Sequence, residues 1–140
     1  METPGESTQS NSRTVLVVDD DPNCTSTLAE LLRCQGFEAV GVTSGTQALL
    51  YIEEHGPPGL ILLDLIMPEL DGFKVLEEMR KNKITTPVLV WSDLSQREDI
   101  KKAENLGANG YLVKFETSLA EVVEKIQELL VGNFGQAQAV

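Results

Sequence analysis

The feature that most limits the fold is a short run of aliphatic residues, 60–63, which ends at Asp64. Four consecutive aliphatic residues are too few for a helix, and proline or glycine stands on both sides of them, at 57–59 and at 68. Such a run is typical of a strand that is buried on both faces inside a parallel sheet. Because ligands bind outside the carboxyl ends of the strands in such sheets, Asp64 lies where a site is expected.

The same pattern recurs along the whole chain. Caps and apolar stripes predict a helix after each strand, the fourth of them over about 96–106. The third is expected to turn Phe73, Leu76 and Met79 toward the sheet. Five alternating strands and helices require right-handed crossovers and hence a parallel sheet covered on both faces. The predicted fold class is therefore α/β, a doubly wound (βα)5 three-layer sandwich around a five-stranded parallel sheet. The expected strands are 14–18, 37–42, 60–63, 87–91 and 111–113.

The length of 140 residues is enough for one domain with its own core. Residues 1–12 are polar and lack an apolar period, which predicts a disordered tail before a domain at 13–132, with a second tail at 133–140. No apolar run approaches the roughly 20 residues that span a bilayer, and the start lacks the features of a signal peptide. A cytoplasmic location is expected.

Charge and cysteine content exclude several functions. A net charge of -11 opposes binding to nucleic acid and to anionic membranes, so neither is an expected partner. Cys24 and Cys34 are predicted to lie on one helix, about 15 Å apart along its axis. A disulfide needs Cα atoms within about 7 Å, so we predict two unpaired thiols. His55 is expected near a helix C-terminus, as a cation rather than as a base or ligand.

Chemically active side chains stand at the carboxyl ends of four predicted strands: Asp19 and Asp20 after the first, Asp64 after the third, Ser92 after the fourth and Lys114 after the fifth. Three carboxylates brought together repel one another unless a cation neutralises them. Mg²⁺ fits, because it prefers oxygen ligands. One carboxylate could then act as a nucleophile toward phosphorus, with a hydroxyl and an ammonium beside it.

This arrangement resembles the receiver domain of two-component response regulators, the CheY-like family, over residues 14–131. The resemblance implies a flavodoxin-like topology with strand order 2-1-3-4-5. The family's positions fall on these residues: the paired acids on Asp19 and Asp20, the phosphoacceptor on Asp64, the switch hydroxyl on Ser92, the lysine on Lys114, the switching aromatic on Tyr111, and the loop signature on Met67, Pro68, Asp71 and Gly72.

By this resemblance, a histidine kinase or phosphotransfer protein passes a phosphoryl group to Asp64. The resemblance also implies that Mg²⁺ is bound by Asp20, Asp64, the backbone carbonyl of Ile66 and, partly through water, Asp19. The chain is then a signalling domain rather than an enzyme.

Phosphorylation is expected to draw Ser92 toward a phosphoryl oxygen and to turn Tyr111 inward. The face made by the fourth helix, fifth strand and fifth helix would change and bind a downstream protein target. Homodimerisation through the fourth helix is left open.

The chain departs from the family after its lysine, where Phe115 replaces a proline that often follows a cis peptide bond. A cis bond before a residue other than proline costs about 3 to 4 kcal/mol. We therefore predict either a trans bond between Lys114 and Phe115 or a locally strained loop.

Three further residues are expected to modulate the pocket. Asp93 adds a fourth carboxylate that either slows small phosphodonors such as acetyl phosphate or instead caps the fourth helix. Ile66 and Leu94 are apolar and should exclude the attacking water, which predicts a long-lived phospho-Asp64. Trp91, the only tryptophan of the chain, precedes Ser92 on its strand and is expected in the core.

Three alternatives come from other classes. Asp19, Asp20 and Asp21 after a strand are similar to the DxD motif of haloacid-dehalogenase-type phosphatases, although the later acidic pair is missing. A flavodoxin-like cofactor binder would need a phosphate-binding loop at those positions. A pseudo-receiver that binds partners without phosphorylation is favoured by Asp93 and Phe115.

Overall fold

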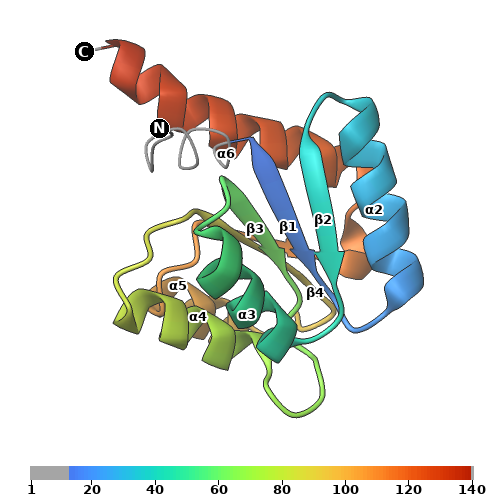
Figure 1. The fold of residues 1–140 in the computed structure, drawn as a ribbon. Coiled ribbons are helices and arrows are strands. Elements are labelled where there is room, and N and C mark those ends of the chain that lie inside the picture. Colours follow the sequence, from blue (N-terminus) through green and yellow to red (C-terminus); the bar gives the residue numbers. More distant parts are fainter. Residues whose placement is uncertain (1–12, 140) are drawn as a thin grey trace.

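The computed structural model describes residues 13–139, with side chains described through residue 130. The predicted tail at 1–12 lies outside the described residues. Five parallel strands form one sheet in the order β2-β1-β3-β4-β5, which confirms the predicted fold class and strand order (Figure 1). The strands are β1 (Thr14–Val18), β2 (Glu38–Val42), β3 (Leu60–Leu63), β4 (Val88–Ser92) and β5 (Gly110–Val113).

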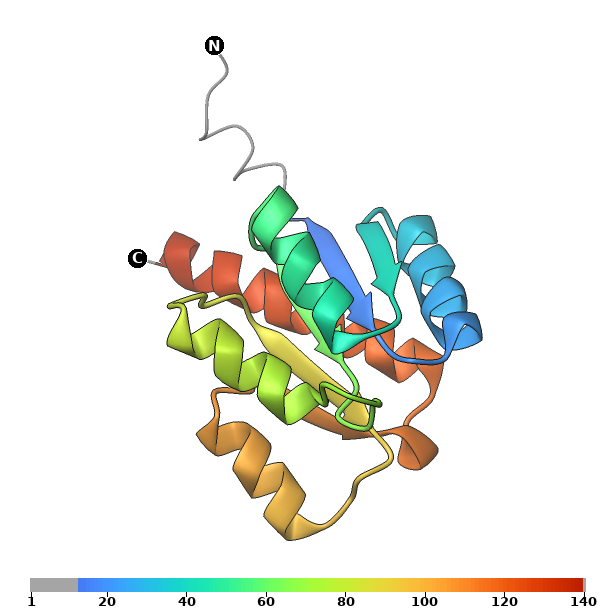
Figure 2. The ribbon, with the colours of Figure 1, turned by 60° about the horizontal axis from the view of Figure 1, so that its bottom comes forward.

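Helices cover both faces of the sheet. Helices α2 and α6 pack on one face, here called the α2/α6 face, and helices α3, α4 and α5 pack on the other, the α3/α4/α5 face (Figures 1 and 2). A short 3-10 helix, η1, follows β5. Their bounds are α2 (Pro22–Cys34), α3 (Gly45–His55), α4 (Gly72–Lys81), α5 (Arg97–Asn105), η1 (Lys114–Glu116) and α6 (Leu119–Ala139).

Alternation along the strands divides the core into two clusters. In β1, Val15 and Val17 pack on the α2/α6 face, while Leu16 and Val18 pack on the α3/α4/α5 face. All four are at most 1% exposed, as expected for a strand buried on both sides. This alternation decides on which face each side chain at the carboxyl edge of the sheet lies.

Side-chain caps start four of the helices where the sequence predicts them. Asp21, Ser44 and Asp71 each accept a hydrogen bond from a backbone N–H in the first turn of α2, α3 and α4. At α6, the Ser118 hydroxyl accepts from the Glu121 N–H while the Glu121 carboxylate accepts from the Ser118 N–H, a reciprocal capping box. These caps fix the helix starts close to the carboxyl edge of the sheet.

Two details differ from the prediction. The backbone of α6 continues as a helix to Ala139, beyond the expected domain end at residue 132. In α4, Val75 is fully buried, whereas Phe73, which we expected against the sheet, is only half-buried beneath the Lys102 ammonium. The cause is helical phase, because Val75, Leu76 and Met79 already fill the inward face.

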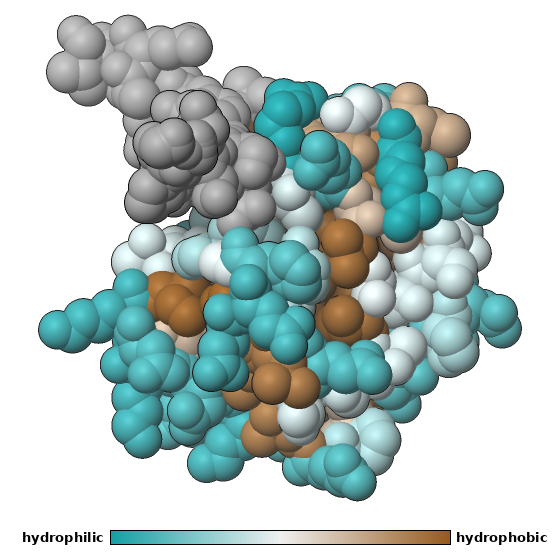
Figure 3. All heavy atoms as spheres, viewed as in Figure 1, coloured by the Kyte–Doolittle hydropathy of each residue, from teal (hydrophilic) through white to brown (hydrophobic). Residues whose placement is uncertain are grey.

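The two cysteines lie on α2, and the histidine lies on α3. Cys24 and Cys34 are both unpaired thiols, as predicted. His55 is the last residue of α3, where its ring stacks on that of Tyr51. Within the described part of the chain, no helix is both long enough and apolar enough to cross a membrane. Seen from one side, the surface carries separate apolar patches among hydrophilic residues (Figure 3).

Candidate functional site

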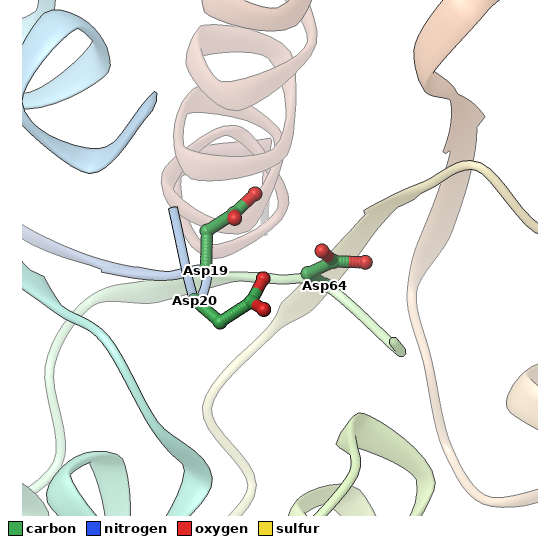
Figure 4. Close-up of side chains that lie close together, drawn as sticks. All are labelled: Asp19, Asp20 and Asp64. Atoms are coloured by element: carbon green, nitrogen blue, oxygen red, sulfur yellow. The ribbon is translucent and has the colours of Figure 1, made fainter. Parts of the chain in front are cut away.

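Three aspartates gather at the carboxyl edge of the sheet and form what we call the acidic cluster: Asp19, Asp20 and Asp64 (Figure 4). One carboxylate oxygen from each lies within 4.8 Å of the others. Asp19 and Asp64 are buried, whereas Asp20 is exposed. The sequence therefore predicts correctly that these side chains meet.

The sheet itself fixes two members of the acidic cluster. The Asp19 N–H donates to the Val42 carbonyl at 3.2 Å, and the Asp64 N–H donates to the Val18 carbonyl at 3.0 Å. Both residues thus extend the parallel ladder one step beyond the assigned strands. Since Val17 and Leu62 lie on the α2/α6 face, the alternation also places Asp19 and Asp64 on that side.

Local backbone groups hold the two buried carboxylates in place. The Asp21 N–H donates to Asp19 Oδ1 at 2.9 Å, and the Ile66 N–H donates to Asp64 Oδ1 at 3.1 Å. Gly72, at the start of α4, packs so closely on the backbone of Asp64 that a Cβ atom would overlap the Asp64 carbonyl oxygen. Glycine at this position therefore allows α4 to begin directly beside the phosphoacceptor candidate.

Lys114 bridges the buried pair of carboxylates. Its Nζ donates to Asp19 Oδ2 at 2.6 Å and to Asp64 Oδ2 at 3.2 Å. The peptide bond from Lys114 to Phe115 is trans, which is one of the two conformations that the sequence predicts. Phe115 belongs to η1 and is 68% exposed, so the residue in place of proline leaves the reach of Lys114 intact.

The surroundings shift the pKa values of the buried groups. Burial raises the pKa of Asp64, although the Ile66 N–H and the Lys114 charge oppose this effect. Burial lowers the pKa of Lys114, but its hydrogen bonds to Asp19 and Asp64 and their charges outweigh this, so the net shift is upward. Burial and the nearby Asp19 raise the pKa of Cys24 to about 12, so this thiol stays protonated at neutral pH.

The charges of the cluster do not balance. Three carboxylates face one ammonium, which leaves an excess of negative charge in a partly buried site. Every candidate ligand in the cluster is a carboxylate oxygen, the ligand type that suits a hard cation such as Mg²⁺. The donor set and the charge excess therefore both fit a divalent cation.

Two hydroxyl groups lie on the other side of the site. Ser92 is fully buried, and its Oγ accepts from the Leu94 N–H at 3.3 Å. The Tyr111 hydroxyl donates to the Leu94 carbonyl at 2.7 Å. Burial is the main cause that raises the pKa of Tyr111 to about 12, so its hydroxyl remains a donor. Both hydroxyls thus meet at the backbone of Leu94.

The predicted pocket modulators lie around the rim. Ile66 is 49% exposed and Leu94 is half-buried. Asp93 is exposed and does not belong to the acidic cluster. The alternative that Asp93 caps the fourth helix is wrong, because Gln96 is the N-cap residue of α5.

Sequence reasoning missed the part that Trp91 plays in this site. We expected a core residue, and Trp91 does pack in the core of the α2/α6 face. The Lys114 ammonium also lies 5.2 Å from the centroid of the Trp91 ring. The alternation of side chains along the strands could have revealed this contact. Trp91 is paired in register with Leu112, and Leu112 comes two residues before Lys114.

Comparisons with known proteins agree with the geometry. Residues 15–127 match the response regulator receiver domain, and the chain belongs to this family. It is 34% identical over 128 residues to the transcriptional regulatory protein PdtaR of Mycobacterium tuberculosis, covering 91% of this chain and 61% of that protein. It is 39% identical over 116 residues to the transcriptional regulatory protein PrrA of Mycobacterium bovis, covering 83% of this chain and 49% of that protein.

Solved structures show the same fold. The receiver domain of the Francisella response regulator 1452 superposes with a TM-score of 0.80 at 29% identity, covering 86% of this chain and 98% of that one. A receiver domain protein from Methanospirillum hungatei reaches a TM-score of 0.82 at 24% identity, covering 89% and 98%, and supports the fold alone. The chain spans less than two thirds of the length of the two curated relatives named above.

Proposed function

We propose that this receiver domain takes a phosphoryl group onto Asp64 from a histidine kinase or a phosphotransfer protein. The observation that carries the proposal is the position of the Lys114 ammonium between Asp19 and Asp64, inside the acidic cluster. A buried nucleophile candidate, an ammonium and a set of hard-cation ligands then meet at one edge of the sheet. This combination is what phosphoryl transfer to a carboxylate requires.

In the proposed step, a carboxylate oxygen of Asp64 attacks the phosphorus atom of a phosphohistidine. A P–O bond forms, the P–N bond breaks, and its electron pair remains on the departing imidazole nitrogen. The Lys114 ammonium, which lies on Asp64 Oδ2, stabilises negative charge on the phosphoryl oxygens.

Asp20, Asp64 and the Ile66 carbonyl are proposed to hold Mg²⁺, with Asp19 contributing partly through water. When bound, this ion supplies positive charge that offsets the charge of the phosphoryl group. The excess of carboxylates over ammonium groups in the cluster supports this assignment.

The response is proposed to pass through Leu94. A phosphoryl oxygen on Asp64 accepts a hydrogen bond from the Ser92 O–H, and the movement of Ser92 toward it weakens the bond that Ser92 Oγ accepts from the Leu94 N–H, which alters the loop that Tyr111 also holds. Because this loop leads into α5, the face of α5, β5 and α6 would change and present itself to a downstream protein target. The apolar Ile66 and Leu94 at the rim support the expectation of a long-lived phospho-Asp64, since they offer an attacking water no hydrogen bond.

The test is intact mass spectrometry after incubation with acetyl phosphate and Mg²⁺, followed by peptide mapping. We expect a mass increase of one phosphoryl group, located on Asp64. Asp64→Asn should abolish it, whereas Asp93→Asn, which alters an exposed aspartate outside the acidic cluster, should retain it. Label on Asp19 would instead support the phosphatase alternative, and no label on any aspartate would support the pseudo-receiver.

A further inference from the structure

Trp91 lies on the same face of the sheet as the charged groups of the site. It is paired in register with Leu112, and alternation places Lys114, two residues further on, on the same side as Leu112. The Lys114 Nζ is 5.2 Å from the centroid of the Trp91 ring, which is within the range of a cation–π contact. The lysine therefore contacts Asp19, Asp64 and an aromatic ring.

These three contacts are unequal. The Nζ lies at 2.6 Å from Asp19 Oδ2 but at 3.2 Å from Asp64 Oδ2, so the ammonium is held more tightly by the carboxylate that is not the proposed nucleophile. An ammonium has three donors, and the two carboxylates accept two of them. The Trp91 ring is an additional attractive group that limits where the ammonium can move.

Packing alone does not explain an indole at this position. Trp91 is 7% exposed, and its Nε1 is buried with no hydrogen-bond acceptor among the described residues. A buried N–H without a partner costs free energy, which an aliphatic side chain at the same place would avoid. The part of the side chain with a distinct contact is the ring system that faces Lys114.

We propose that Trp91 is a positioning residue for phosphoryl transfer, whose ring holds the Lys114 ammonium beside Asp64. This inference rests on the function proposed above. Without the ring, Lys114 would spend more time with Asp19 or with solvent and less time beside the incoming phosphoryl group. Phosphorylation of Asp64 should then slow although no group that touches the phosphoryl donor has been changed.

The first test measures initial rates of labelling by acetyl phosphate at saturating Mg²⁺. We expect Trp91→Leu to be slower by about fivefold, the factor of a typical cation–π contact, with Trp91→Phe between it and the wild type. Leu89→Ala is the matched control, since Leu89 lies on the same strand and face, is fully buried and has no aromatic ring to hold the ammonium. Equal slowing in Leu89→Ala at an equal loss of Tm would overturn the proposal.

A double-mutant cycle asks whether Trp91 acts through the lysine. In the background Lys114→Met, the substitution Trp91→Leu should cause no further decrease in the labelling rate. A further decrease by the same factor as in the wild-type background would show that Trp91 acts independently of Lys114 and would contradict the inference.

An NMR measurement tests the contact without phosphorylation. The ε-methylene protons of Lys114 should show a ring-current shift that is reduced in Trp91→Phe and lost in Trp91→Leu. An unshifted wild-type signal would overturn the inference.

The labelling experiments distinguish failure of this inference from failure of the proposed function. A wild type labelled on Asp64 together with an unchanged rate in Trp91→Leu would remove the role of Trp91 and leave the proposed function intact. A wild type that takes no label would remove both.

Discussion

The two faces of the sheet contribute different kinds of groups to the site. The α2/α6 face carries the charged half, in which Lys114 contacts Asp19 and Asp64 directly. The α3/α4/α5 face carries the hydroxyl half, in which Ser92 and Tyr111 are joined only through the backbone of Leu94. The alternation of side chains along the strands thus places the groups that suit phosphoryl transfer on one face of the sheet and the groups that suit a conformational change on the other.

The physical difference between the halves is how easily their contacts exchange. Removing the Lys114 ammonium would leave Asp19 and Asp64 buried without a compensating charge, which is strongly unfavourable. A hydrogen bond between a hydroxyl and a loop backbone contributes only about 1 kcal/mol, and another partner can replace it. The charged half is therefore expected to stay fixed while the hydroxyl half rearranges.

The strongest test of the charged half is Lys114→Met. We expect labelling of Asp64 to fall by about 100-fold, a loss typical of removing one group that stabilises developing charge. Mg²⁺ affinity should change in the opposite direction and tighten by about tenfold, because a competing unit charge leaves a partly buried site. Isothermal titration calorimetry measures the affinity.

Lys101→Met is the control for Lys114→Met, since it removes the same charge from an exposed position on α5. It should leave the labelling rate and the affinity for Mg²⁺ nearly unchanged. Weaker Mg²⁺ binding in Lys114→Met would contradict competition between the ammonium and the metal ion.

The second prediction concerns the raised pKa of Asp64. Because burial raises this pKa in the folded state above the ordinary value of 3.8, the folded protein binds the proton more tightly than the unfolded chain does. The corresponding stability is fully present below pH 3.8 and is lost as the pH rises through the folded-state pKa. Asp64→Asn, which removes the buried charge, should therefore raise the Tm by a few degrees at pH 7 in metal-free buffer.

The advantage of Asp64→Asn should shrink as the pH is lowered, because the wild-type carboxyl group becomes neutral as well. Thermal unfolding followed by circular dichroism at several pH values, with chelator present, gives this difference directly. A lower Tm for Asp64→Asn at pH 7 would show that the contact with Lys114 outweighs the cost of burial.

The third prediction addresses the hydroxyl half. Ser92→Ala and Tyr111→Phe should each destabilise the fold by about 1 kcal/mol, the usual contribution of one hydrogen bond. Since both hydroxyls bind the Leu94 backbone, their effects should be coupled by about 0.5 kcal/mol in the double mutant. Urea unfolding measures all three variants.

Tyr51→Phe serves as the control, because it removes a hydroxyl from the same face of the sheet without touching Leu94. Its effect on the free energy of unfolding should be additive with the effect of Ser92→Ala. Strict additivity of Ser92→Ala with Tyr111→Phe would mean that the two hydrogen bonds to the Leu94 backbone stabilise the fold independently.

The two halves also differ in how far the sequence predicts them. The charged half follows from strand ends. Asp19 and Asp64 each come directly after a buried strand, and Lys114 comes directly after the half-buried strand β5, and the apolar runs fix the position and direction of these strands. The strand register then brings their side chains together. The site of Trp91 against Lys114 follows from the same alternation, but only once the register of β4 and β5 is known.

The hydroxyl half depends on loop conformation, which a local pattern determines poorly. Gln96 rather than Asp93 caps α5, and the bonds of Ser92 and Tyr111 to Leu94 depend on backbone atoms that carry no sequence signal. The expectation for Phe73 was wrong for a related reason. The apolar stripe of a helix does not show which residues at its edge the sheet covers.

The smallest predicted effect tests whether the loop of the hydroxyl half influences the charged half. Asp93 is exposed, so its repulsion of an anionic phosphodonor is weakened by solvent and salt. Asp93→Ala should therefore speed labelling by acetyl phosphate by only about twofold at low ionic strength and not at all at high salt.

Glu98→Ala, which removes an exposed acid from the first turn of α5, is the control and should leave the rate unchanged. An unchanged rate for Asp93→Ala at low salt would mean that the donor meets only the charges of the acidic cluster. A twofold gain that disappears with salt would instead show that the loop adjusts access to Asp64 through its charge alone, while the contacts of Lys114 decide the chemistry.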